Sequence, residues 1–288
     1  MTLHWPSKNF WYRTLFGIAF TAVTALIIGI SHLPFCGWIF ASGVALIQLV
    51  ALTEYVQLAK GKGFAPAAPL LYLLGSAYIF LHYLSITIPL FSLLPALALL
   101  IGTLVGSCGS FGNQNNALAN FALTVFGFAY ITLPLSWLLD INFLASSPVG
   151  TPSFFWIVWL LVVTKGGDMA AYFSGKVLGK HSLAPFISPK KTIEGAIFGI
   201  MGSAFFGAIL AIAWAGESRA IASFAMLGAL VGLVGIAGDL FESLLKRDVG
   251  VKDSNAIPGL GGILDIVDSL LFAIPLLLLY LMLTGQMV

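Results

Sequence analysis

The chain has 288 residues, of which 59% are hydrophobic and only 8% are charged, whereas soluble domains contain roughly 45–50% and 25%. Together with a mean hydropathy of +1.02, this composition predicts a polytopic membrane protein and excludes a soluble globular fold. The formal net charge of +2 leaves no electrostatic footprint for nucleic acid. Two cysteines, Cys36 and Cys108, are too few for a disulfide framework or a zinc cluster.

Nine apolar runs have the length of about 20 residues that a membrane-spanning helix needs. They lie at residues 14–32, 36–58, 68–85, 88–106, 118–139, 153–174, 194–214, 220–244 and 263–284. The first run lacks a convincing small-residue cleavage site, so we interpret it as a retained span and not as a signal peptide. Neither a repeat nor a long linker divides the chain. We therefore expect a single all-α membrane domain over 1–288, with plain hydrophobic spans in 1–145 and polar motifs in the spans of 153–284.

The basic residues predict the orientation of these nine spans. With alternating spans, one side of the membrane would carry eleven of the thirteen lysines and arginines, and the other side would carry Arg219 alone, since Lys165 falls within a span. Cytoplasmic loops are enriched in Lys and Arg. This side, and with it the N-terminus, is therefore predicted to face the cytoplasm; its residues are Lys8, Arg13, Lys60, Lys62, Lys176, Lys180, Lys190, Lys191, Lys246, Arg247 and Lys252.

Acidic residues concentrate at the predicted cytoplasmic ends of the last four spans. On a helix, Asp239, Glu242 and Ser243 share one face of the eighth span, and Asp265 and Asp268 share one face of the ninth. Two helices could then point carboxylates at each other across a cavity. Hard oxygen ligands of this kind suit a divalent cation and a substrate phosphate.

The alternative for these acids is purely structural. Salt bridges between helices, for example from Asp265 to Lys246 or Arg247, would also lower the cost of burying charge in a membrane. Ionisable residues within membrane spans are functional by default, and acids outnumber bases at this depth. We therefore favour the metal site.

Two loops next to these acids have the composition of phosphate-binding segments. Gly259, Gly261 and Gly262 would leave backbone amides free at the start of the ninth helix; the alternative is an ordinary tight turn. Lys190 and Lys191 precede the start of the seventh helix, which suits a polyphosphate or an anionic headgroup; the alternative is anchoring by positive charge. Thr192 could cap that helix.

The sixth span carries a further charged pair. Lys165 and Asp168 lie three residues apart and are expected to pair at least partly. Asp168 and Tyr172 share a helix face and could line the same cavity. We interpret Asp168 as functional and leave Lys165 evenly balanced between a functional and a structural role.

Four segments of the sequence resemble a known family. The segment SLLKRDVGVKDSNAIPGLGGILDIVDS (243–269) is similar to the C-terminal signature of phosphatidate cytidylyltransferases, also called CDP-diacylglycerol synthases. The upstream segments GDMAAYFSGKVLGK (167–180), ISPKKTIEG (187–195) and GDLFES (238–243) resemble further parts of that family, in the same order. The sequence departs from the most familiar form of the pattern at two positions, where Leu260 replaces a histidine and Ile266 replaces an arginine.

The resemblance implies an enzyme that converts phosphatidate and CTP to CDP-diacylglycerol and pyrophosphate. It implies catalytic roles for Asp168, Asp239, Lys246, Asp265 and Asp268, with Mg²⁺ held by Asp239, Asp265 and Asp268, and with room for a second cation such as K⁺. We also expect an integral protein of a bacterial inner membrane, with its active site on the cytoplasmic side and a homodimer as a candidate assembly. Substrate-binding roles fall on Lys190, Lys191, Ser243, Lys246, Arg247, Lys252, Gly259, Gly261 and Gly262.

Two other functions stay open. A CTP-dependent polyprenol or lipid kinase would pass the γ-phosphate of CTP to an alcohol and release CDP. An ion-coupled transporter would use the acids to bind an ion, although transporter sites usually lie near the midplane of the bilayer and not at one face.

Overall fold

The computed structural model describes residues 21–33, 35–109, 116–145, 152, 154–215, 221–251 and 262–287. Predictions that concern Lys8, Arg13, Lys252, Gly259, Leu260 and Gly261 lie outside these described residues. Within them, helical segments occupy all nine predicted positions. They are the first helix (Thr21–Ile30), α2 (Gly37–Gly61), α3 (Ala68–Thr87), the 3₁₀ turn η1 (Pro89–Phe91), α4 (Leu94–Gly109), α5 (Ala117–Gly127), the π-helical turn η2 (Phe128–Thr132), α6 (Leu133–Phe143), α7 (Phe155–Leu178), α8 (Ile193–Leu210), the π-helical turn η3 (Ala211–Ala215), α9 (Ile221–Asp248) and α10 (Ile263–Leu283).

Six helices among the described residues are long and apolar enough to cross a membrane. The three segments α5, η2 and α6 join into one of them, Ala117–Phe143, and α8 continues into η3 in another. The first helix and the segment Pro89–Gly102 are apolar but shorter. The prediction of a polytopic helical membrane protein is therefore confirmed, whereas the count of nine spans stays a prediction.

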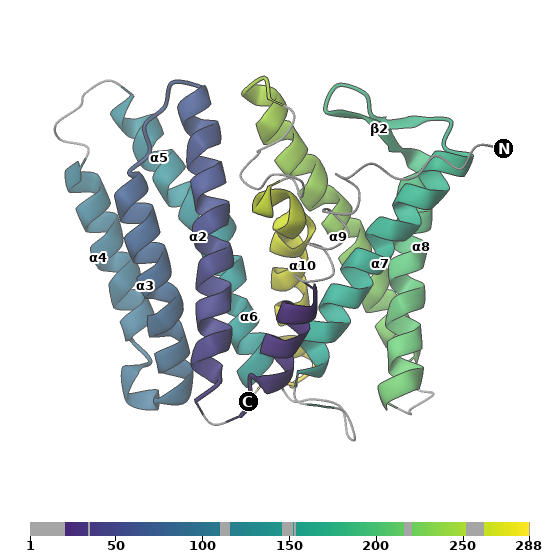
Figure 1. Ribbon diagram of the computed structural model, residues 1–288, viewed down its shortest axis with the longest axis horizontal. Helices are drawn as coiled ribbons and strands as arrows, with labels where there is room; N and C mark the ends of the chain where they lie inside the picture. Colours follow the sequence, from purple (N-terminus) through teal and green to yellow (C-terminus); the bar gives the residue numbers. More distant parts are fainter. Residues whose placement is uncertain are drawn as a thin grey trace.

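Consecutive helices run in alternating directions, which brings the basic residues to one end of the bundle. In Figure 1 the C-terminal ends of α2, α7 and α9 lie at the top, and the C-terminal end of α10 lies at the bottom. An ion pair of 2.8 Å between Lys62, just after α2, and Asp248, at the end of α9, links two of the upper ends. Among the described residues, every lysine and arginine except Lys165 lies in these upper ends or in the segment between α7 and α8.

The segment between α7 and α8 differs from the predicted loop. It forms an antiparallel hairpin of β1 (Ser182–Ala184) and β2 (Ser188–Thr192), so the fold is not strictly all-α. The predicted cap on α8 is confirmed, because the Thr192 hydroxyl accepts a hydrogen bond of 3.1 Å from the Gly195 N–H. The hairpin therefore leads directly into α8 and holds Lys190 and Lys191 in a strand.

Helix α10 lies at the centre of the bundle. It contacts α2 and α6 on one side and α7 and α9 on the other, as Figure 1 shows. Its apolar side chains are correspondingly buried; Leu264, Ile274 and Leu277, for example, are fully inaccessible. Because α10 joins the N-terminal helices to the group α7–α9, its position determines how the two halves meet.

The helices α7, α8 and α9 pack closely through small residues. A Cβ atom added at Gly228 of α9 would lie 2.5 Å from the Ser203 carbonyl oxygen of α8, and one added at Gly207 of α8 would lie 2.5 Å from the Phe224 carbonyl oxygen of α9. Helices in membranes associate through such small residues, which let the backbones approach. This close contact holds the C-terminal part of α8 against the N-terminal part of α9.

We expect Gly228→Ala to destabilise the protein by about 1–3 kcal/mol, because backbone atoms must move to make room for the methyl group. The measurement is the midpoint of thermal unfolding in detergent. Gly43→Ala is the matched control, since its added Cβ would meet only Ile27 side-chain atoms, the nearest at 3.8 Å. Equal midpoints for the two variants would contradict the close α8–α9 contact.

Candidate active site

A cavity of about 610 Å³ lies where α7, the hairpin, α8, α9 and α10 meet. Four aspartates and three lysines line it, together with apolar and small residues. The charged residues are Asp168, Lys176, Lys190, Lys191, Asp239, Asp265 and Asp268. Such a concentration of charge within a bundle this apolar is costly, and in membrane proteins it marks a functional site.

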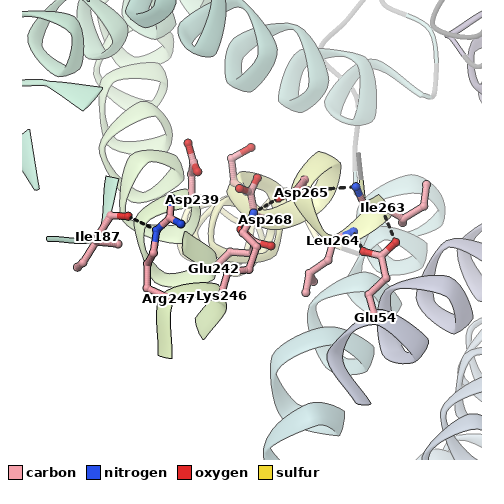
Figure 2. Close-up of polar contacts among 12 residues, drawn as sticks. Glu54, Ile187, Asp239, Glu242, Lys246, Arg247, Ile263, Leu264, Asp265 and Asp268 are labelled. Atoms are coloured by element: carbon pink, nitrogen blue, oxygen red, sulfur yellow. Dashed lines mark hydrogen bonds and ion pairs between the residues drawn. The ribbon is translucent and has the colours of Figure 1, made fainter. Parts of the chain in front are cut away.

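The predicted meeting of carboxylates from α9 and α10 is confirmed. Asp239 of α9 and Asp265 and Asp268 of α10 all line the cavity, and Figure 2 shows them on these two neighbouring helices. Asp268 is buried, and its Oδ1 accepts a hydrogen bond of 2.5 Å from the Ser269 N–H. The two helices are held together at this level because the backbone of Gly238 lies against the carbonyl oxygen of Asp268.

Behind the cavity, Lys246 joins two acids from different helices. Its Nζ lies 2.6 Å from Oε2 of Glu242, one turn earlier on α9, and it also pairs with Oδ1 of Asp265 on α10. Glu242 and Lys246 are both buried. The pair between Lys246 and Asp265 is the interhelical salt bridge that the structural alternative predicted. Asp265 thus both braces α10 against α9 and lines the cavity.

Helix α7 closes another side of the cavity. Lys165 Nζ lies 3.2 Å from Asp168 Oδ2, which confirms the predicted pair, and donates a second hydrogen bond of 3.2 Å to the Ser269 hydroxyl of α10. Asp168 and Tyr172 both line the cavity, as their shared helix face predicts. Lys165 therefore connects α7 to the residue that follows Asp268.

The hairpin brings its lysines to the cavity through contacts at both of its ends. At its base, Glu194 Oε2 accepts hydrogen bonds from the N–H groups of Lys180 and His181, at 3.1 and 3.3 Å. Near its turn, the carbonyl oxygen of Ile187 accepts a hydrogen bond of 2.9 Å from Nε of Arg247 (Figure 2). Lys191 then lies 2.5 Å from Asp239 Oδ2 across the cavity.

Several predicted substrate-binding residues are placed differently. Of the described residues, Ser243, Lys246 and Arg247 do not line the cavity; Lys246 contacts it only through Asp265, and Arg247 is exposed and bonded to the hairpin. The prediction of free amides at the start of α10 is wrong for the described part, because the Gly262 N–H donates to Asp265 Oδ2 at 3.1 Å. The next two amides bond Glu54 (Figure 2).

The donor chemistry fits a hard divalent cation. Carboxylate oxygens from α9 and α10 line one cavity that also has room for water and phosphate. Among the residues that the structure describes, however, no three acidic, histidine or cysteine side chains are already grouped as a metal site. Lysines neutralise two of the predicted ligands, since Lys191 pairs with Asp239 and Lys246 pairs with Asp265. The metal assignment of Asp239, Asp265 and Asp268 stays a prediction.

Two residues near the site were not predicted from the sequence. Lys176 lines the cavity, although its position at the end of a span suggested only an orientation signal. Glu54 of α2 reaches the start of α10. The signal for Glu54 was its isolation, since a single carboxylate within an otherwise apolar span needs a partner.

Comparison with known proteins agrees with this geometry. A model of the cytidylyltransferase family matches residues 11–284. The chain belongs to the cytidylyltransferase family. The chain is 34% identical to a protein of Synechocystis sp. named phosphatidate cytidylyltransferase, over 91% of the chain and 95% of the relative.

Two further relatives carry the same name. The protein of Chlamydia pneumoniae is 30% identical to this chain, over 85% of the chain and 83% of the relative. The protein of Helicobacter pylori is 45% identical over a shorter match, which covers 40% of the chain and 43% of the relative. The resemblance found in the motifs thus extends to proteins that match nearly the whole chain.

Proposed function

We propose that this protein is a phosphatidate cytidylyltransferase, which converts phosphatidate and CTP to CDP-diacylglycerol and pyrophosphate. The observation that carries the proposal is the cavity, where four aspartates and three lysines meet at the basic end of an apolar bundle. A bilayer lipid and a cytosolic polyanion can both reach such a position. Full-length relatives with this name support the substrate assignment.

In the proposed reaction, a phosphate oxygen of phosphatidate attacks the α-phosphorus of CTP. The bond from that phosphorus to the bridging oxygen breaks, and pyrophosphate leaves with the bonding electrons. The nucleophile is already ionised near neutral pH, so the reaction mainly needs positioning and charge neutralisation. A missing histidine at Leu260 therefore does not remove a required base.

Different residues of the cavity would supply the positioning and the charge neutralisation. Lys190 and Lys191, with Lys176, supply positive charge for the triphosphate or for phosphatidate, and Asp168 shapes the wall opposite α10. Asp239, Asp265 and Asp268 would hold Mg²⁺, with K⁺ as a candidate second cation, and the metal would supply charge neutralisation on the phosphates. Lys246 would orient Asp265, with which it pairs.

The orientation in the membrane belongs to the same proposal. Nine spans would place the N-terminus and the cavity on the cytoplasmic side of a bacterial inner membrane. The grouping of basic residues at the cavity end supports this, since cytoplasmic loops are rich in Lys and Arg. A homodimer is the proposed assembly, to be tested by the mass of the purified protein in detergent.

The test is to incubate purified protein in detergent with phosphatidate, Mg²⁺ and CTP that carries ³²P at either the α or the γ position. A cytidylyltransferase puts the α label into lipid and the γ label into pyrophosphate. In a parallel assay with a polyprenol alcohol as the acceptor, a lipid kinase would put the γ label into lipid and release CDP. A transporter consumes no CTP in either assay. Absence of lipid label and of pyrophosphate across a range of divalent metals would overturn the proposal.

A further inference from the structure

Glu54 of α2 binds the start of α10, which lies 209 positions later in the chain. Its Oε1 accepts a hydrogen bond of 2.8 Å from the Ile263 N–H, and its Oε2 accepts one of 2.8 Å from the Leu264 N–H. The side chain is fully buried. Figure 2 shows Glu54 reaching across from α2, with both oxygens directed at the first turn of α10.

This contact satisfies groups that have no partner within the helix. The first four N–H groups of an α-helix lack intrahelical acceptors, and a negative charge near them interacts favourably with the helix dipole. A carboxylate supplied by a distant helix also does what a local cap cannot. Its two hydrogen bonds fix both the height and the rotation of α10 relative to α2.

The rotation of α10 determines where two candidate catalytic carboxylates lie. Asp265 and Asp268 follow Leu264 by one and four residues, within the first two turns of the helix, and both line the cavity. A shift of the first turn moves them relative to Asp239 on α9 and to Lys191 on the hairpin. Misplacing a reacting group by about 1 Å can cost roughly 10²-fold in rate.

We propose that Glu54 is a positioning residue, which holds the first turn of α10 so that Asp265 and Asp268 face Asp239 across the cavity. This inference rests on the proposed function, because it assigns Glu54 to the same reaction. It gives the N-terminal half of the chain a direct part in the site, through α2. The alternative is a cap that only stabilises the fold.

The experiment compares Glu54→Gln with Asp140→Asn in the full-length protein. The glutamine keeps the size of the side chain, but its amide NH2 is a donor and cannot accept a hydrogen bond from one of the two backbone N–H groups. Asp140→Asn is the matched control. Asp140 of α6 is also largely buried, and it pairs with His82 of α3 at 2.8 Å. Both variants neutralise one acid of the N-terminal half.

For Glu54→Gln we expect kcat per folded molecule to fall about 10- to 100-fold. The KM for CTP should stay close to the parental value, because Glu54 does not line the cavity, and the Mg²⁺ concentration for half-maximal rate should rise. Hydrogen exchange of residues 262–268 should become faster. Asp140→Asn should leave kcat, the Mg²⁺ response and this exchange unchanged.

A second variant removes a donor and keeps Glu54. Ile263→Pro deletes one N–H at the first helical position, which tolerates proline, and Gly262 already has φ −82° and ψ 153°, as a residue before proline requires. We expect the kcat of Ile263→Pro to fall. The control Ile263→Val also shortens the side chain but keeps the N–H, so its kcat should equal the parental value. In the double variant Glu54→Gln with Ile263→Pro, the fold-decrease in kcat should be smaller than the product of the two single fold-decreases.

Each outcome bears on the proposal. Unchanged kcat and an unchanged Mg²⁺ response in folded Glu54→Gln, even with faster exchange, would overturn the positioning role and leave only a structural cap. If Glu54→Gln does not fold, a parental kcat in Ile263→Pro would overturn it instead. An inactive parental protein would contradict the proposed function, and the exchange data would still report whether Glu54 holds α10.

Discussion

Replacing Asp268 with asparagine is expected to lower CDP-diacylglycerol formation by roughly 10²–10³-fold, in a protein that still folds and inserts into the membrane. The asparagine side-chain oxygen can still accept the hydrogen bond from the Ser269 N–H, and the volume of the side chain hardly changes. What is lost is one negative charge at the wall of the cavity, opposite Asp239. The measurement is the rate of ³²P-labelled lipid formation, titrated with Mg²⁺.

Asp248→Asn provides the control for charge removal at the same end of the bundle. Asp248 ends α9, is exposed, and pairs with Lys62 at 2.8 Å outside the cavity. Exposed ion pairs contribute about 0–1 kcal/mol, so this variant should turn over at the parental rate. Asp265→Asn should behave like Asp268→Asn. Normal turnover in both Asp265→Asn and Asp268→Asn would show that the metal assignment is wrong.

Most helix positions could be predicted because hydropathy is a property of consecutive residues. The apolar run at 68–85 corresponds to α3 at Ala68–Thr87, and the run at 194–214 corresponds to α8 with η3 at Ile193–Ala215. The hairpin could not be predicted in this way. Its strands have three and five residues, and the second, SPKKT, has a proline and two lysines, which are not typical of strands. Its contacts with Arg247 and Glu194 stabilise it from outside.

The site was only partly predictable, for a similar reason. Scarcity of charge singled out Asp168, Asp239, Asp265 and Asp268, and the structure brings all four to one cavity, although their catalytic roles stay predictions. Helical spacing placed Asp239, Glu242 and Ser243 on one face of α9, but of these three only Asp239 lines the cavity. A helix face is wide, and its neighbours decide which residues reach a given space.

The contact of Glu54 leaves even less trace in the sequence. Its partners are two backbone N–H groups, which every residue except proline carries, so no side-chain pattern reveals them. The expectation that amides at the start of α10 are free for a phosphate is wrong, for this reason, in the described part of that start, Gly262–Leu264. The buried carboxylate of Glu54, from another helix, already accepts hydrogen bonds from two of these amides.

Lys246→Met is expected to lower both the stability and the activity of the protein. Lys246 is 8% exposed and pairs with Glu242, which is fully buried, and with Asp265. Removing one partner of a buried ion pair leaves an uncompensated charge and costs about 3–5 kcal/mol. The yield of folded protein in detergent and the midpoint of thermal unfolding measure this loss, and the lipid-labelling assay measures the loss of turnover.

The double variant Glu242→Gln with Lys246→Met separates the two effects. It neutralises both buried charges, and replacing a whole buried pair by neutral groups is often neutral or stabilising. We therefore expect the unfolding midpoint to recover toward the parental value. Turnover should remain low, because Asp265 no longer has the ammonium group that orients it at the cavity wall. Recovery of full turnover together with stability would instead mean that Lys246 only braces α9 against α10 and does not position Asp265 for the reaction.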